Sequence, residues 1–334
     1  MTDNDKAILV IGAGAWGTAL ALVLARNDNH TYLYDSNSTH VENLIRESCN
    51  TRHLPDFPFP RQLHPIAEFL PLPEGVEDIV IVVPCDALRE VVNRLKTLDT
   101  GRIKLCLACK GLEPDSLLLN NQVVAEVLGN VAVAILSGPS FAREVAAGLP
   151  TAVTVASTDD TAAHFAERFH NEVFRVYTHD DVIGVQIGGA VKNVMAIAAG
   201  IADGLGFGAN TRSALITRGL AEMMRLGTAM GGRQETFMGL TGLGDLVLTC
   251  TDDQSRNRRF GLALARGLTP EQAQNEINQL IEGIRTVGVV KELARVYNIE
   301  MPISEQVFNI IQGTVNVREA VQELLARERK VETD

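Results

Sequence analysis

The chain has 334 residues, of which 46% are hydrophobic and 21% are charged. This length allows two domains with buried cores, and the composition is that of an ordinary globular protein. The net charge of −11 argues against nucleic acid as the main partner, because phosphate neutralisation requires a basic face. The polar, acidic start of the chain lacks the pattern of a secretory signal, and five cysteines suggest reduced thiols, so we expect a cytoplasmic protein.

A glycine-rich turn near the start connects a predicted strand, Ala7–Ile11, to a predicted helix that runs to about Arg26. Gly12, Gly14 and Gly17 form the pattern G-x-G-x-x-G. The first glycine makes the tight turn, the second lets a pyrophosphate approach the backbone, and the third allows close packing of helix on strand. The N–H groups of the helix N-terminus would bind the phosphates. This context favours a dinucleotide site over a plain glycine turn.

The second predicted strand, His30–Asp35, ends in an acidic residue. Asp35 lies 18 positions after Gly17, close to the ~20 expected for a carboxylate that binds the ribose of a dinucleotide.

Strands and helices alternate up to about residue 180. We expect residues 50–75, which are rich in proline, to be loop and irregular structure. Further strands are predicted at 78–84, 103–109, 131–137, 151–157 and 174–178, with helices at 86–95, 117–128 and 161–169. This alternation predicts an α/β fold with a doubly wound, mostly parallel sheet.

Only helical patterns follow residue 180. They cover about 182–202, 211–230, 241–250, 256–266, 270–281, 285–297, 303–311 and 316–328. We therefore expect a Rossmann-type domain at 1–180 and an all-α domain at 181–334.

Lys192 is the one charged residue in the apolar stretch 182–202. A membrane span is disfavoured because Gln186, Lys192 and Asn193 lie centrally, where a lysine alone costs about 2.5–3.5 kcal/mol. The lysine could also pack its stem on the surface and extend its head to water. A helix so apolar on all sides favours burial, which makes Lys192 a candidate proton carrier. Nearby glycines at 184, 188 and 189 would permit another backbone or a ligand to approach closely.

Other candidate residues follow predicted strands or begin helices. Lys110 comes at the carboxyl end of a strand, where doubly wound folds bind ligands, although a surface cation is an equal alternative. Ser137-Gly138-Pro-Ser140 could offer N–H groups to an anion or be a plain turn. Asp245 could be a helix N-terminal acid or a site carboxylate.

The basic segment Ser255-Arg256-Asn257-Arg258-Arg259 suits a phosphate at Arg256 and Asn257, which would follow a capping serine. A solvated helix start remains the alternative for Arg258 and Arg259. Cys106 and Cys109 resemble a metal or redox pair, but in a strand they would point to opposite faces. We therefore expect no metal site.

Seven motifs follow one another along almost the whole chain. They are Gly12-Ala-Gly14-Ala15-Trp16-Gly17-Thr18, Lys110-Gly111-Leu-Glu113, Ser137-Gly138-Pro-Ser140-Phe-Ala142, Gly188-Gly189-Ala-Val-Lys192-Asn193, Asp203-Gly-Leu-Gly-Phe-Gly208-Ala-Asn, Gly242-Leu-Gly-Asp245-Leu-Val-Leu-Thr-Cys-Thr and Ser255-Arg256-Asn257. Together they resemble the bacterial NAD(P)-dependent glycerol-3-phosphate dehydrogenases. The resemblance implies a Rossmann domain followed by a helical domain, in a homodimer.

The resemblance also implies a reaction, the oxidation of sn-glycerol 3-phosphate to dihydroxyacetone phosphate. Its reverse usually supplies phospholipid synthesis. Lys192 would then be the general acid/base, and Asp245 and Asn193 would hold Lys192 and the substrate. The other implied substrate contacts are Lys110, Gly138, Ser140, Ser255, Arg256 and Asn257.

The implied cofactor is NAD or NADP, without a metal. Beyond Gly12 and Gly14, the implied contacts are Ala15, Trp16, Ser36, Lys110, Ala142, Arg256, Leu280 and Glu282. Asp35 would bind a ribose 2′-OH and repel a 2′-phosphate, which favours NAD, whereas the family often uses NADPH and Ser36 could accept a phosphate. We expect NAD to be used at least as well as NADP.

Two other functions fit parts of the pattern. Another two-domain dehydrogenase of the β-hydroxyacid or hydroxyacyl type would need different anchors for a carboxylate or a thioester. A non-catalytic NAD(P)-sensing protein would not need a buried lysine that faces an anion-binding cluster.

Overall fold

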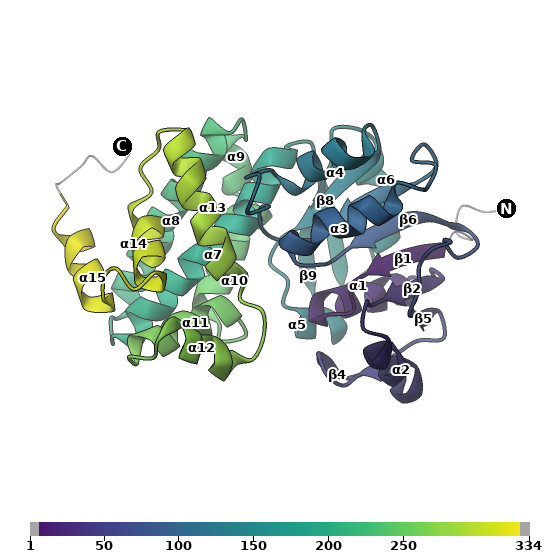
Figure 1. The fold of residues 1–334 in the computed structure, drawn as a ribbon, viewed down its shortest axis with the longest axis horizontal. Coiled ribbons are helices and arrows are strands. Elements are labelled where there is room, and N and C mark those ends of the chain that lie inside the picture. The colour runs from purple at the N-terminus through teal and green to yellow at the C-terminus, as the bar shows by residue number, and fades with distance from the viewer. Residues whose placement is uncertain (1–6, 328–334) are drawn as a thin grey trace.

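The computed structural model describes residues 7–327. Figure 1 shows two lobes, an α/β lobe formed by the first half of the chain and a helical lobe formed by the second. Helix α7 (Val182–Gly204) contacts strands β8 (Ala132–Ser137) and β9 (Thr151–Ala156), and a short π-helical segment, η2 (Leu240–Gly244), contacts β9. The lobes therefore meet at these two strands.

The α/β lobe contains a sheet of eight strands in the order β10-β9-β8-β7-β6-β1-β2-β5. The strands are β1 (Ala7–Ile11), β2 (Thr31–Tyr34), β5 (Leu63–Ile66), β6 (Val76–Ile81), β7 (Lys104–Leu107), β8 (Ala132–Ser137), β9 (Thr151–Ala156) and β10 (Phe174–His179). Neighbours run parallel except β8 and β9. The prediction of a doubly wound, mostly parallel sheet is therefore confirmed.

Helices cover both faces of this sheet. β1 is apolar at every position, and its side chains alternate between two cores: Ile8 and Val10 pack in one, Leu9 and Ile11 in the other. The first core is closed by α1 (Ala15–Arg26), α5 (Ala142–Ala146) and α6 (Thr161–Phe169). The second is closed by α3 (Cys85–Leu95) and α4 (Asn120–Leu128).

The expectation that residues 50–75 are irregular is wrong in part. β5 pairs in parallel with β2 at the edge of the main sheet, from Thr31 opposite Leu63 to Tyr34 opposite Ile66. β3 (Cys49–Asn50) and β4 (Leu54–Pro58) form a separate antiparallel pair after α2 (Ser38–Glu47). The prolines hide these strands from sequence analysis because an edge strand tolerates proline, whose ring removes a hydrogen-bond donor.

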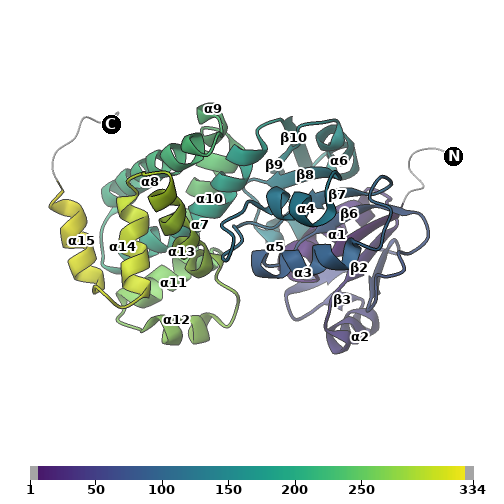
Figure 2. The ribbon, with the colours of Figure 1, turned by 45° about the horizontal axis from the view of Figure 1, so that its top comes forward.

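The helical lobe surrounds α7 (Val182–Gly204), which contacts α8, α10, α11, α13 and α14. Figures 1 and 2 both show α7 inside this lobe. The other helices are α8 (Ala209–Ala229), α9 (Gln234–Phe237), α10 (Asp245–Thr251), α11 (Arg256–Ala265), α12 (Pro270–Ile277), α13 (Glu282–Val296), α14 (Pro302–Ile311) and α15 (Val317–Leu325). The predictions missed α9, and the single helix predicted at 241–250 is divided into η2 and α10. The end of the predicted helix 316–328 lies outside the described residues.

α7 is long and apolar enough to cross a membrane, but 94% of its apolar window is buried inside the protein. It is therefore the core of the helical lobe. Glycines permit this close packing: a Cβ at Gly200 would lie 2.1 Å from the Arg258 carbonyl oxygen, and one at Gly261 would lie 2.1 Å from that of Ile197.

Candidate active site

The glycine-rich turn after β1 has the geometry that its sequence predicts. Gly12 has φ +112°, and a Cβ there would lie 2.4 Å from the Val82 carbonyl oxygen. A Cβ at Gly17 would lie 1.9 Å from the Gly12 oxygen, which fixes α1 close to the turn. A Cβ at Gly14, by contrast, would meet nothing within 4 Å. The backbone at Gly14 is thus open to an approaching group.

Asp35 lies directly after β2 and beside this turn. Its Oδ2 accepts a hydrogen bond from the Ala13 amide (3.2 Å), and its Oδ1 accepts one from the Asn37 amide (3.0 Å). Ser36 is exposed next to it. These bonds fix the carboxylate where a ribose would lie if a pyrophosphate occupied the N-terminus of α1.

Trp16 adds an unfilled hydrogen-bond donor to the turn. Its Nε1 is buried and has no partner among the described residues. Lys110 Nζ lies 5.9 Å from the centre of its ring, so the turn faces the lysine that follows β7. An open glycine, a ribose-directed carboxylate and a free donor at one place fit a nicotinamide dinucleotide.

Lys192 lies inside the helical lobe with only 6% of its surface exposed. Its Nζ donates a hydrogen bond to Asp245 Oδ1 and another, of 3.1 Å, to Thr249 Oγ1. Asp245 is fully buried at the start of α10. The segment before α10, η2, can lie this close to α7 because position 188 is a glycine: a Cβ there would lie 2.4 Å from the carbonyl oxygen of Thr241 in η2. The expected close approach of another backbone to α7 is therefore found.

Lys110 joins the same carboxylate from the α/β lobe. Its Nζ donates to Asp245 Oδ2 (3.0 Å) and to the Gly138 carbonyl oxygen (2.9 Å). Ser140 Oγ donates to the same Gly138 oxygen at 2.9 Å. Ala142 begins α5 just beyond. The structure thus brings together residues predicted from three separate motifs.

Burial is the main cause that lowers the pKa of Lys192, to about 7. Asp245 opposes this shift because a carboxylate stabilises the ammonium ion, while the positive charge of Lys110 adds to it. This pKa lies in the range suited to a general acid/base at neutral pH.

A chain of amide groups connects α7 to the start of α11. Asn257 Nδ2 donates to Asn193 Oδ1 (2.9 Å), and Asn257 Oδ1 accepts from the Gly283 amide (2.9 Å). Ser255 caps α11 by accepting from the Arg258 amide, as its position predicts. The side chain of Asn257 is therefore engaged on both ends with protein groups.

Arg256 and Arg258 point to different surroundings. Arg256 is the exposed first residue of α11. Arg258 is buried and pairs with Asp203 (2.7 Å) and with Asp253. The alternative of a solvated Arg258 is therefore wrong, because this cation is neutralised inside the helical lobe.

Leu280 and Glu282 lie at the junction of α12 and α13, and Glu282 is the first residue of α13. Burial raises the pKa of Glu282 to about 7, against the opposing charges of Arg256 and Arg285. The junction thus lies close to the start of α11.

The sequence patterns predict no side-chain role for two polar residues of the site, Thr249 and Ser137. Thr249 lies one helical turn after Asp245, and this i+4 spacing could have identified it. Ser137 Oγ is buried without a partner in the described part of the chain, and a Cβ at Gly189 would lie 2.8 Å from it. No sequence signal distinguishes this serine from a turn residue.

Cys106 and Cys109 do not lie side by side. Cys106 and Cys109 pack in the cores on opposite faces of the sheet and are free thiols. Burial raises the pKa of the Cys109 thiol to about 12. Within residues 7–327, no group of three or more His, Cys, Asp or Glu side chains could hold a metal ion.

Comparison with known proteins agrees with this geometry. The family described as NAD-dependent glycerol-3-phosphate dehydrogenase matches with its N-terminal part at residues 7–163 and its C-terminal part at residues 181–322. The chain belongs to this family. Relatives named glycerol-3-phosphate dehydrogenase [NAD(P)+] from Shigella boydii and Escherichia coli are 48% identical over 335 aligned residues, which cover 99% of both chains.

A solved member of the family has nearly the same fold. The glycerol-3-phosphate dehydrogenase of Coxiella burnetii has a TM-score of 0.94 and 50% identity, and covers 97% of this chain and 99% of its own. D-mandelate dehydrogenase solved with NADH shares only the fold, with a TM-score of 0.62 and 12% identity over 94% of this chain and 99% of its own.

Proposed function

We propose that this protein is an NAD(P)-dependent sn-glycerol-3-phosphate dehydrogenase that interconverts sn-glycerol 3-phosphate and dihydroxyacetone phosphate. The observation that carries the proposal is the buried Lys192–Asp245–Lys110 arrangement at the junction of the two lobes. Family membership and the glycine-rich turn beside Lys110 support it.

Lys192 is the general acid/base of the proposed reaction. In the oxidative direction, neutral Nζ accepts the proton of the C2 hydroxyl group while the hydride leaves C2. In the reductive direction, protonated Nζ polarises the C2 carbonyl group and then donates its proton. A pKa of about 7 makes both forms available near neutral pH.

Asp245 and Lys110 prepare Lys192 for this role. Asp245 orients Nζ and stabilises its protonated form, while Lys110 limits that stabilisation. Because Lys110 also bonds to the Gly138 oxygen, next to Ser140, it holds the substrate-facing end of β8 in place. We assign Lys110, Gly138, Ser140, Asn193 and Asp245 to the substrate side of the site.

The phosphate of the substrate is assigned to the start of α11. Arg256 offers a bidentate guanidinium group at the first position of a ten-residue helix, whose N-terminus also favours an anion. Ser255 and Asn257 support this terminus, since both side chains bond to the protein itself. An anchor at this end would orient C2 toward Lys192 and so lower the barrier.

The dinucleotide is assigned to the turn at Gly12 and Gly14, with Ala15, Trp16, Asp35, Ser36, Lys110, Ala142, Arg256, Leu280 and Glu282 around it. When bound, it accepts hydride from C2 or returns it. Asp35 faces the ribose with a fixed negative charge, so we propose that NAD is used at least as well as NADP.

One assay tests the proposed reaction. Adding dihydroxyacetone phosphate to the protein with NADH should lower the NADH absorbance. The same assay with a 2-keto acid or a 3-ketoacyl thioester separates the rival dehydrogenases, because the anchor at Arg256 suits a phosphate. If no substrate oxidises NADH, the non-catalytic NAD(P)-sensing function is favoured.

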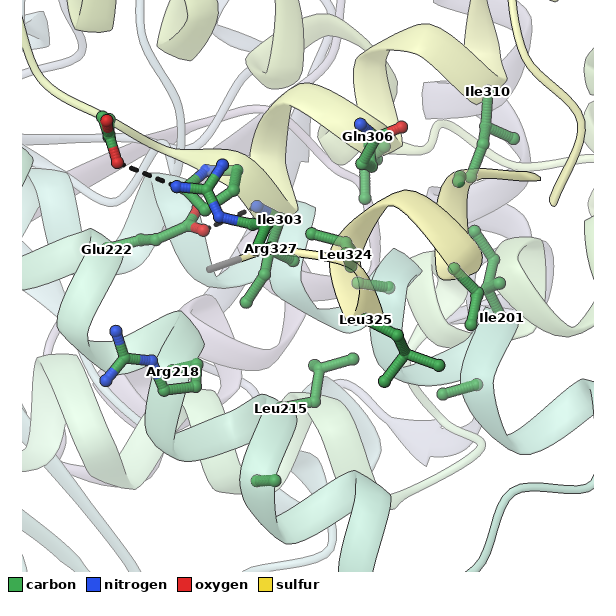
Figure 3. A pocket seen from close by; sticks show the side chains of 18 of the residues that line it. Ile201, Leu215, Arg218, Glu222, Ile303, Gln306, Ile310, Leu324, Leu325 and Arg327 are labelled. Carbon is green, nitrogen blue, oxygen red and sulfur yellow. Dashed lines mark hydrogen bonds and ion pairs between the residues drawn. The ribbon is translucent and has the colours of Figure 1, made fainter. Parts of the chain in front are cut away.

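We also propose a homodimer formed through the helical lobe. α7, α8, α14 and α15 surround an apolar cavity of about 800 Å³ (Figure 3), whose lining includes Leu215, Ile303 and Leu324. Leu325 is 80% exposed at its edge, and Phe207 is 38% exposed. On the rim, Arg327 pairs with the Glu300 carboxylate and Arg225 donates to the Glu300 carbonyl oxygen, so the rim carries charges of both signs. An apolar patch with a mixed-sign rim suits a second copy, because a two-fold contact must be self-complementary.

Light scattering during size-exclusion chromatography tests the dimer. The wild-type mass should be about twice the 36.1 kDa of one chain. Leu325→Glu should shift it to one chain, whereas Ile45→Glu, at an exposed site on α2, should not. A wild-type protein with the mass of one chain would contradict this interface.

We also propose a domain boundary, a cellular location and a metabolic role. The domain boundary lies at residues 180/181, between β10 and α7. The protein acts in the cytoplasm, and its reductive direction supplies glycerol 3-phosphate for phospholipid synthesis. The boundary follows from the change from alternating strands and helices to helices alone, and the other two statements follow from the family's general role.

A further inference from the structure

The first turns of α3 and α13 face each other across the junction of the lobes. Asp86, the second residue of α3, forms an ion pair with Arg285, the fourth residue of α13. The two residues are 199 positions apart, and their side chains are 41% and 43% exposed. The pair therefore links the α/β lobe to the helical lobe at the surface.

The loop that follows Lys110 runs between these two helix starts. A Cβ at Gly111 would lie 2.9 Å from Cys85 Sγ and 3.7 Å from Thr286 Oγ1. Cys85 and Thr286 are the chain neighbours of Asp86 and Arg285. Any separation of α3 from α13 would thus loosen the packing around the loop that carries Lys110.

Arg285 also lies near a second carboxyl group. Glu282 is one helical turn before it, and both Arg285 and Asp86 influence Glu282 electrostatically. The Arg285 guanidinium group therefore interacts with Asp86 of the α/β lobe and with Glu282 of its own helix. Asp86 competes for Arg285 and draws the start of α13 toward α3.

Other polar contacts also cross the junction. Lys110 pairs with Asp245 (3.0 Å), and Gln254 Nε2, before α11, donates to Glu144 Oε1 of α5 at 2.8 Å. The Lys110–Asp245 pair lies in the site, where Asp245 is fully buried, whereas Asp86–Arg285 joins opposite full charges at the surface.

We propose that the Asp86–Arg285 ion pair is a clasp that holds the start of α13, with Glu282, against the α/β lobe and so closes the two lobes over the dinucleotide. Both are positioning residues, because they act through Glu282 and the Lys110 loop. Both lobes would contact the same dinucleotide. An ion pair that already holds the lobes together before binding reduces the entropy that is lost when the dinucleotide binds. The clasp rests on the proposed function.

Cofactor affinity can be measured without turnover, because Trp16 is the single tryptophan of the chain and lies in the glycine-rich turn. Titration of its fluorescence with NADH gives Kd. Arg285→Ala and Asp86→Ala should each raise Kd and the KM for NADH about two- to fivefold, the range of a partly exposed ion pair, with a smaller change in kcat. Arg285→Lys should retain most of the affinity.

The exchange variant D86R/R285D separates the clasp from other roles. It restores the opposite charges across the junction, so it should return Kd toward the wild-type value. The difference between wild type and Arg285→Ala should also shrink in 1 M salt, where charges are screened beyond about 3 Å. Arg295→Ala is the matched control, because Arg295 lies on the same helix and, within the described residues, its ion pair is local, with Glu292.

Two results would overturn the clasp. One is an unchanged Kd in both Arg285→Ala and Asp86→Ala. The other is an exchange variant that binds as weakly as Arg285→Ala, which would mean that Arg285 contacts the dinucleotide directly. Failure of the wild type to reduce dihydroxyacetone phosphate would instead contradict the proposed function, and the comparison of Kd values would still stand.

Discussion

Lys192 and Asp245 are 53 positions apart in the sequence, yet Lys192 Nζ donates a hydrogen bond to Asp245 Oδ1 in the interior of the protein. The other oxygen of the same carboxylate accepts a hydrogen bond from Lys110 of the α/β lobe. One buried acid is thus shared by two lysines from two lobes. The proton chemistry of Lys192 therefore depends on how the lobes meet.

Replacing Lys192 should separate chemistry from binding. Lys192→Met removes the proton carrier and should lower kcat about 10²–10⁴-fold, the usual contribution of a general acid/base. NADH affinity, measured by Trp16 fluorescence, should change little. Lys96→Met, at an exposed position after α3, is the control. Near-normal turnover by Lys192→Met would remove this residue from the mechanism.

The kcat values of the oxidative and the reductive reaction should respond to pH in opposite ways. Because the pKa of Lys192 is lowered to about 7, the oxidative kcat should rise as pH increases through about 7, and the reductive kcat should fall there. Asp245 raises this pKa and Lys110 lowers it. Asp245→Asn should therefore move both midpoints to lower pH, and Lys110→Met should move them to higher pH.

Profiles of kcat against pH in both directions check this prediction. Midpoints that move the same way in both variants would show that the two side chains do not act on Lys192 by charge.

Thr249 should act as a positioning residue. Thr249→Val keeps the shape but removes the 3.1 Å bond to Lys192 Nζ, so kcat should fall about tenfold with a smaller change in KM. Thr251→Val is a close control. Thr249 Oγ1 also donates to the carbonyl oxygen of Asp245, four residues before it, and Thr251 makes the same type of bond to Val247 in the same helix but is exposed. Equal losses in the two variants would indicate damage to α10 rather than to Lys192.

Asp35 should set the choice between NAD and NADP. The kcat/KM of the wild type with NADH should at least equal that with NADPH. Asp35→Asn keeps an acceptor near the Ala13 amide but removes the charge, so the NADPH/NADH ratio should rise about tenfold. Glu42→Gln, at an exposed position on α2, should leave the ratio unchanged. A strong preference of the wild type for NADPH would contradict the role of Asp35.

The sequence predicts those features that depend on neighbouring residues. The apolar run before Gly12 and the alternating segments up to residue 180 predict the parallel sheet, because strand and helix periods are local properties. The order of the motifs predicts the family. The isolation of Lys192 in an apolar stretch predicts its burial and its lowered pKa.

Only the tertiary structure decided which groups face one another. It brought Asp245 to Lys192 and Lys110, it added Thr249, and it neutralised Arg258 against Asp203. It also placed β5 at the edge of the sheet despite its proline. These outcomes depend on packing between segments that are far apart in the sequence, such as the approach of Thr241 to Gly188. The residues around each position contain no local signal for such a contact.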